Sequence, residues 1–192
     1  MTTWTISQFL RDPEDPEWEK LVISQFPEGV HPKRKEGFLL ARSSLRDCFR
    51  SVELDCPIQS LALRDFSHLE ILPQFTISLS HTNQCGAAFI ALRKDFRSVG
   101  IDVEHEERIV KPSVMERIKN PIDINLREIE LWCLKEAAFK ALMNSGNFQS
   151  PIEFSSISIE KNKWTHLETN LTGSWELSNL KPFVVARSLL EN

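Results

Sequence analysis

The chain lacks any long apolar run. No stretch approaches the roughly 18 consecutive apolar residues that span a bilayer, so no membrane-spanning helix is expected. Residues 1–10 also lack the basic start and apolar stretch of a secretory signal. No C-x-x-C pair occurs among the four cysteines, Cys48, Cys56, Cys85 and Cys133, which argues against a disulfide or zinc framework. We therefore expect a protein of the reducing cytoplasm.

Neither sign of charge dominates. The sequence has 23 Lys and Arg against 27 Asp and Glu, a net charge of -4, so it lacks a general nucleic-acid footprint. Any anionic ligand must then be held by a local cluster of positive side chains. Low-complexity segments and short repeats are absent as well. The 192 residues, of which 41% are hydrophobic, suffice for one good-sized core or two small ones.

One basic helix is expected in the first half of the chain. Residues 31–49 place apolar side chains near helical spacing, and Pro32 suits the first helical position. Basic residues, Arg34 and Arg42 among them, lie mostly off the apolar stripe. They form either a solvated face or part of an anion site.

A hairpin should follow. Residues 75–80 alternate apolar and hydroxyl side chains, residues 86–92 read as a more buried strand, and residues 81–84 form the turn between them. Ser80 and His81 stand at the end of the first strand. Adjacent serine and histidine do not make the arrangement of a hydrolase nucleophile, and a turn whose hydroxyl groups hold the backbone explains them equally well.

A strand over residues 98–104 carries two carboxylates on one face. Its valines and isoleucine point one way, whereas Gly100, Asp102 and Glu104 point the other. The Cα atoms of Asp102 and Glu104 lie roughly 6.6 Å apart, so the like charges repel unless a divalent cation lies between them. Gly100 would leave room for a ligand near the backbone. Alternatively, both carboxylates simply face solvent.

A strong helix is predicted over residues 125–143, with Asn125 as its cap and residues 144–146 as its stop. One of its faces carries polar and aromatic residues spaced four apart: Glu128, Trp132, Glu136 and Lys140. Glu136 and Lys140 could form no more than a helical ion pair. A short helix over residues 112–119 and strands over residues 156–160, 174–177 and 183–186 complete the prediction.

These elements predict an α+β fold of two halves, each a long helix with a few strands. The halves are residues 1–97, with the basic helix and the serine-histidine segment, and residues 98–192, with the carboxylates and the lysine-glutamate segment.

Three segments, in this order, resemble the 4'-phosphopantetheinyl transferase superfamily. Residues 78–82 resemble its serine-histidine motif, residues 99–104 its glycine-x-aspartate-x-glutamate motif, and residues 132–140 its tryptophan-x-x-lysine-glutamate-alanine-x-x-lysine motif. The first motif and the chain length point to the single-chain surfactin and enterobactin type. Residues 35–42 resemble the arginine-bearing helix of that type.

The resemblance implies a pseudo-dimer of two similar α+β halves with the active site in the cleft between them. The implied reaction transfers 4'-phosphopantetheine from coenzyme A to a serine of an apo acyl or peptidyl carrier protein and releases 3',5'-ADP. It implies Mg²⁺, or Mn²⁺ in its place, and a cytoplasmic enzyme that is expected to be a monomer with neither nucleic acid nor membrane as partner.

The resemblance also assigns residues. The implied metal ligands are Asp102, Glu104 and Glu136. The implied catalytic residues are Asp102, Glu136 and Lys140, with Glu136 as either the third ligand or a general base. The implied contacts to coenzyme A are Arg34, Arg42, Ser80, His81, Lys135 and Lys140.

Two alternatives stay open: a non-catalytic module that binds coenzyme A or a carrier, and a metal-dependent phosphohydrolase. The chain departs from the family pattern at residues 69–73, which lack the usual glycine-lysine-proline. The short stretch between Asp102 and Glu136 predicts an unusual choice of carrier.

Overall fold

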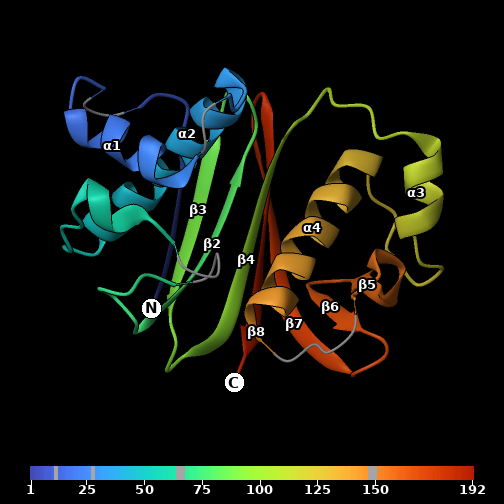
Figure 1. Cartoon of the computed structure of the whole chain (residues 1–192). Helices are drawn as coiled ribbons and strands as arrows, with labels where there is room; N and C mark the ends of the chain where they lie inside the picture. The colour runs from blue at the N-terminus through green and yellow to red at the C-terminus, as the bar shows by residue number, and fades with distance from the viewer. Residues whose placement is uncertain (11–12, 27–28, 64–67, 147–150) are drawn as a thin grey trace.

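The computed structural model describes residues 1–10, 13–26, 29–63, 68–146 and 151–192 (Figure 1). Within these ranges the chain forms a mixed α+β structure with four α-helices and two antiparallel sheets. The helices are α1 (Pro16–Gln25), α2 (Pro32–Ser51), α3 (Pro112–Ile118) and α4 (Glu128–Asn144). The strands are β1 (Thr2–Ser7), β2 (Phe75–His81), β3 (Gly86–Leu92), β4 (Phe96–His105), β5 (Ile157–Glu160), β6 (Lys163–His166), β7 (Leu171–Leu180) and β8 (Phe183–Glu191).

The first sheet has the order β1–β3–β2 and packs against α2. The predicted hairpin is confirmed, since β2 pairs antiparallel with β3 from Phe75 opposite Leu92 to His81 opposite Gly86. Gly86 permits the close approach of the helix: a Cβ atom there would lie 2.1 Å from the carbonyl carbon of Leu40. The predicted basic helix is confirmed as α2, which extends two residues further than expected.

The second sheet has the order β4–β8–β7–β6–β5, and α4 packs against β4 and β8. The predicted cap of α4 at Asn125 is wrong. The helix begins at Glu128, because the backbone N–H of Arg127 donates to Glu130 Oε2 at 3.1 Å and the two side chains form an ion pair. Gly146, at φ +74°, follows the end of α4 as the predicted stop.

The two faces of β4 divide as predicted. Val99, Ile101 and Val103 are buried with residues of β3 and β8, whereas Gly100 faces α4. The expectation that Gly100 leaves room for a ligand is wrong. A Cβ atom there would lie 1.8 Å from the carbonyl oxygen of Ala137, so the glycine makes room for the helix.

Strands β2 and β4 bring the two sheets together. The Ser78 hydroxyl accepts a hydrogen bond from the backbone N–H of Ile101 at 3.0 Å, and the Ser80 hydroxyl donates to Asp102 Oδ1 at 2.7 Å. Figure 1 shows α2 and α4 on opposite outer sides of the paired sheets. The predicted division between residues 97 and 98 falls inside β4 and stays a prediction. No helix within the described ranges combines the length and apolar character needed to cross a membrane.

Candidate active site

Asp102 lies where the two sheets and α4 meet, and it is only 5% exposed. Its Oδ1 accepts hydrogen bonds from the Ser80 hydroxyl at 2.7 Å and from Lys140 Nζ at 2.8 Å. Lys140 also donates to the carbonyl of Ile101 at 3.1 Å, so it is tied to β4 instead of forming the helical ion pair with Glu136. Oδ2 of Asp102 is buried and has no hydrogen-bond partner among the described residues. One carboxylate oxygen thus pairs with Ser80 and Lys140, whereas the other is buried without a hydrogen-bond donor.

Glu104 follows Asp102 on the same face of β4 and is also buried. Its Oε1 accepts a hydrogen bond from Trp132 Nε1 at 3.1 Å and forms an ion pair with Arg108. The Arg108 guanidinium lies 5.4 Å from the centre of the Trp132 ring. Sequence reasoning missed Arg108, because a single arginine beyond the end of a strand belongs to no motif or periodic pattern.

Glu136, half-buried on α4, completes the group of carboxylates. Burial raises its pKa to about 7, and the negative charges of Asp102 and Glu104 add to this effect. The positive charges of Lys140 and Arg108 oppose it. Glu136 on α4 is therefore close enough to Asp102 and Glu104 of β4 for their charges to act on it.

The donor chemistry of this site suits a hard divalent cation, since it offers carboxylate oxygens and an unpartnered Oδ2 on Asp102. Among the described residues, however, no three His, Cys, Asp or Glu side chains stand together in an arrangement that would already hold a metal ion. Two of the carboxylates instead form ion pairs with side chains of the protein. Lys140 pairs with Asp102, and Arg108 pairs with Glu104.

A cavity of about 600 Å³ opens between α2, β2 and α4. Four of the predicted coenzyme contacts line it: Arg34, Arg42, His81 and Lys140. Ser80 does not line the cavity and instead holds Asp102. The cavity wall therefore concentrates positive charge beside the carboxylates, although the whole chain is slightly acidic.

Arg42 is fixed in the cavity wall and is 7% exposed. Its Nε donates to the carbonyl of Leu61 at 3.1 Å, and its guanidinium lies 4.2 Å from the centre of the Phe38 ring. Burial lowers its pKa to about 10, so it remains charged at neutral pH. Arg34, two helical turns earlier, lies 5.9 Å from the ring of Phe26.

His81 lies against α2 at Gly37, where a Cβ atom would come within 2.4 Å of His81 Nδ1. Partial burial lowers the pKa of His81, and the charges of Lys140, Arg42 and Arg34 lower it further. Sequence reasoning gave Gly37 no role. The available signal was its position inside a helix, where glycine is costly and usually has a packing reason.

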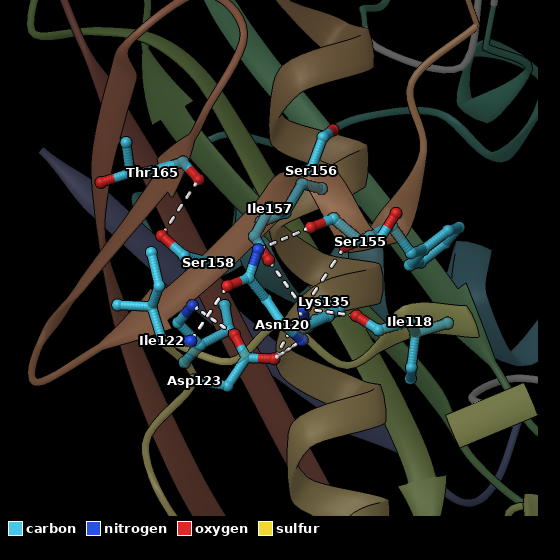
Figure 2. Close-up of polar contacts among 12 residues, drawn as sticks. Ile118, Asn120, Ile122, Asp123, Lys135, Ser155, Ser156, Ile157, Ser158 and Thr165 are labelled. Atoms are coloured by element: carbon cyan, nitrogen blue, oxygen red, sulfur yellow. Dashed lines mark hydrogen bonds and ion pairs between the residues drawn. The ribbon is translucent and has the colours of Figure 1, made fainter. Parts of the chain in front are cut away.

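The prediction that Lys135 faces phosphate groups is wrong. Its side chain is 0% exposed, and Nζ forms an ion pair with Asp123 at 2.8 Å (Figure 2). Nζ also donates to the carbonyls of Ile118 at 2.5 Å and Ile157 at 2.7 Å. Lys135 therefore points to the side of α4 that packs on β5, and its ammonium group has no donor left for a ligand.

Comparison with known proteins finds a match in the second half of the chain. No curated protein matches the chain. A family model described as the 4'-phosphopantetheinyl transferase superfamily matches residues 98–186. The match includes Asp102, Glu104, Glu136 and Lys140, whereas the cations on α2 lie outside it. The segment from residue 98 to residue 186 is thus similar to the 4'-phosphopantetheinyl transferase superfamily.

Proposed function

We propose that this chain transfers the 4'-phosphopantetheine group of coenzyme A to a serine of an apo acyl or peptidyl carrier protein, with release of 3',5'-ADP and dependence on Mg²⁺. The observation that carries the proposal is the position of Asp102. It is held by Ser80 and Lys140, shares its site with Glu136, and lies beside a cavity lined with cationic side chains.

The cavity supports coenzyme A as the donor. Arg42 offers a fixed guanidinium whose planar fork matches phosphate oxygens. Lys140 and Arg34 add positive charge, and His81 adds a ring that can gain a proton when an anion binds. We propose Arg34, Arg42, Ser80, His81 and Lys140 as the coenzyme-binding residues, with Ser80 acting through Asp102.

The carboxylates support a divalent cation, Mg²⁺ or Mn²⁺. Asp102, Glu104 and Glu136 would hold it, and once bound it would supply positive charge to the pyrophosphate oxygens. Phosphoryl-type transfer depends mostly on positioning and charge stabilisation, which this arrangement can provide.

In the proposed step, the serine oxygen of the carrier forms a bond to the β-phosphorus of coenzyme A. The bond from that phosphorus to the bridging oxygen breaks, and 3',5'-ADP leaves with the electron pair. Glu136 is suited to accept the serine proton, because its pKa of about 7 lies near the working pH. Direct ligation of the cation would lower that pKa, so Glu136 acts either as the third ligand or as the base.

The arrangement of elements supports the single-chain surfactin and enterobactin type. Each sheet carries one long helix on its outer side, α2 on the first and α4 on the second, and the cavity lies between these helices. We propose that the two halves form a pseudo-dimer with coenzyme A in the cleft. Such a chain completes its own cleft and would act as a cytoplasmic monomer.

The experiment incubates the purified chain with coenzyme A, Mg²⁺ and a panel of apo carriers, and it measures the intact mass of each carrier. We expect a carrier to gain one phosphopantetheine group and an equal amount of 3',5'-ADP to appear. Asp102→Ala should fold and abolish the transfer. Coenzyme A binding without transfer to any carrier would support a non-catalytic module instead, and 3',5'-ADP release without an acceptor would support a phosphohydrolase.

A further inference from the structure

Arg108 forms an ion pair with Glu104, one of the carboxylates that would hold a divalent cation. It stands in the segment between β4 and α3, and its Nη1 contacts the same Oε1 of Glu104 that accepts the hydrogen bond from Trp132. The guanidinium is held over the ring of Trp132. Arg108 is thus held by an ion pair with Glu104 and by a cation–π contact with the ring of Trp132.

The charge of Arg108 acts on the whole group of carboxylates. The hydrogen bond to Glu104 and the charge of Glu104 raise the pKa of Arg108, and the charges of Asp102 and Glu136 raise it further. In the metal-free protein, two cationic side chains, Arg108 and Lys140, thus oppose the mutual repulsion of three carboxylates.

The two cations differ in how firmly they are held. Lys140 contacts both Asp102 and the backbone carbonyl of Ile101. Arg108 is 48% exposed, whereas its partner Glu104 is 12% exposed, and no backbone carbonyl accepts from it among the described residues. Arg108 can therefore leave into solvent while Glu104 stays in place.

We infer that Arg108 is a resident counter-ion that keeps the carboxylates assembled in the metal-free protein and gives up Glu104 when a divalent cation binds. The inference rests on the proposed function, because it takes Glu104 as a metal ligand. Its consequence is that metal affinity is set by competition with Arg108. Removal of the guanidinium should therefore tighten metal binding, whereas removal of an ordinary structural arginine should not.

The test is a titration of the full chain with Mn²⁺ alone, without coenzyme A or carrier, in which free Mn²⁺ is read by electron paramagnetic resonance. Arg108→Gln should lower the Kd for Mn²⁺ by about two- to fivefold, the size expected for loss of one partly exposed competing ion pair. Arg108→Lys keeps the charge and should stay near wild type. Arg127→Gln is the matched control, because Arg127 is 52% exposed and pairs with Glu130 in the same way.

An unchanged or raised Kd in Arg108→Gln would overturn the inference. Glu104→Gln separates this failure from a failure of the proposed metal site. If Glu104→Gln also leaves Mn²⁺ binding unchanged, then the metal site itself is wrong. If Glu104→Gln weakens binding while Arg108→Gln does not tighten it, only the competition is wrong.

A second measurement follows Arg108 in the wild-type chain and does not depend on how Arg108→Gln folds. Departure of a guanidinium from the ring of Trp132 should change the indole emission on addition of Mg²⁺. Trp132→Phe should remove that change from the spectrum. An emission spectrum that Mg²⁺ leaves unaltered at concentrations that saturate the Mn²⁺ site would contradict the exchange.

Discussion

The surroundings of Glu136 disfavour the ionised form of its carboxyl group. Its pKa of about 7 exceeds the usual 4.5 because of burial and the neighbouring Asp102 and Glu104. The folded state therefore binds more protons than the unfolded state. The resulting contribution to stability is full below pH 4.5 and is lost as the pH rises through 7.

Glu136→Gln should consequently stabilise the metal-free protein at pH 8. A rise of 2.5 pKa units is worth about 3 kcal/mol, which we reduce to about 1–2 kcal/mol because the side chain is only half-buried. Urea unfolding in the presence of a chelator measures it. The gain should shrink towards pH 5, and a gain of equal size at both pH values would show that it does not arise from the ionised carboxylate.

His81 gives a second prediction at the scale of the residue. Its pKa is lowered by burial and by Lys140, Arg42 and Arg34, so a bound phosphate should raise the pKa again. Binding of coenzyme A should then take up a proton, and affinity should increase as the pH falls from 8 to 6. Calorimetry in two buffers of different ionisation enthalpy counts the proton. His81→Asn should remove the uptake; an uptake that persists in this variant would assign it to another group.

At the scale of the element, the buried ion pair of Lys135 and Asp123 ties α4 to its surroundings. Asp123 also accepts hydrogen bonds from the backbone N–H groups of Asn120 at 2.7 Å and Ile159 at 2.8 Å. Figure 2 shows Lys135 of α4 in contact with Asp123, in the segment after α3, and with Ile157 at the start of β5. Lys135 thus helps to fix the position of α4, the helix that carries Glu136.

Lys135→Met should therefore destabilise the fold by about 3–5 kcal/mol, because it leaves Asp123 charged and buried. Activity per folded molecule should fall little. Lys140→Met is the contrasting variant: it also removes the partner of a buried aspartate, Asp102, but because Lys140 lines the cavity it should lower kcat/KM per folded molecule as well. Denaturant unfolding combined with activity corrected for the folded fraction distinguishes the two. A Lys135→Met protein of normal stability that fails to bind coenzyme A would restore the phosphate role that we reject.

Periodicity predicted the elements whose sequences are long enough to show it. Strand β3 was predicted at residues 86–92, where it lies, and α2 and β4 were predicted within a few residues. The four-residue strand β6 (Lys163–His166) is too short for an alternating pattern to stand out. The start of α4 was misplaced because a backbone contact to Glu130 caps the helix and a simple asparagine cap does not.

The candidate site was predictable where residues belong to a motif with fixed spacing. Lys140 pairs with Asp102, and the charges of both act on Glu136. Arg108 and Gly37 escaped because their roles depend on which residues face them in space, namely Glu104 and His81. The prediction that Lys135 contacts phosphate was wrong for the same reason. The motif spacing places Lys135 on α4 but does not show on which side of the helix its partners lie.

At the scale of the whole molecule, the cavity joins parts of the chain that pack into different cores. Arg34 and Arg42 come from α2, which packs on the first sheet, and Lys140 comes from α4, which packs on the second. A ligand that contacts both should stabilise both. We therefore expect coenzyme A to raise the Tm of the chain.

Arg42→Ala should raise the KM for coenzyme A about tenfold, the value of one charge-assisted phosphate contact, and leave kcat nearly unchanged. Arg42 also packs in the wall, so a matched control is needed. Arg93→Ala serves, because Arg93 Nε donates to the carbonyl of Phe75 at 3.1 Å, just as Arg42 Nε donates to that of Leu61. Steady-state kinetics with varied coenzyme A decides, and a fall confined to kcat would contradict the binding role.

The account as a whole depends on carboxylates from β4 and α4 sharing one divalent cation next to the pyrophosphate of coenzyme A. The most direct measurement is a crystal structure of the chain with Mn²⁺ and coenzyme A, in which anomalous scattering locates the ion. We predict one Mn²⁺ bound by Asp102, Glu104 and Glu136 and by pyrophosphate oxygens, with Arg108 released from Glu104. An ion bound elsewhere, or a pyrophosphate remote from Asp102, would contradict the account.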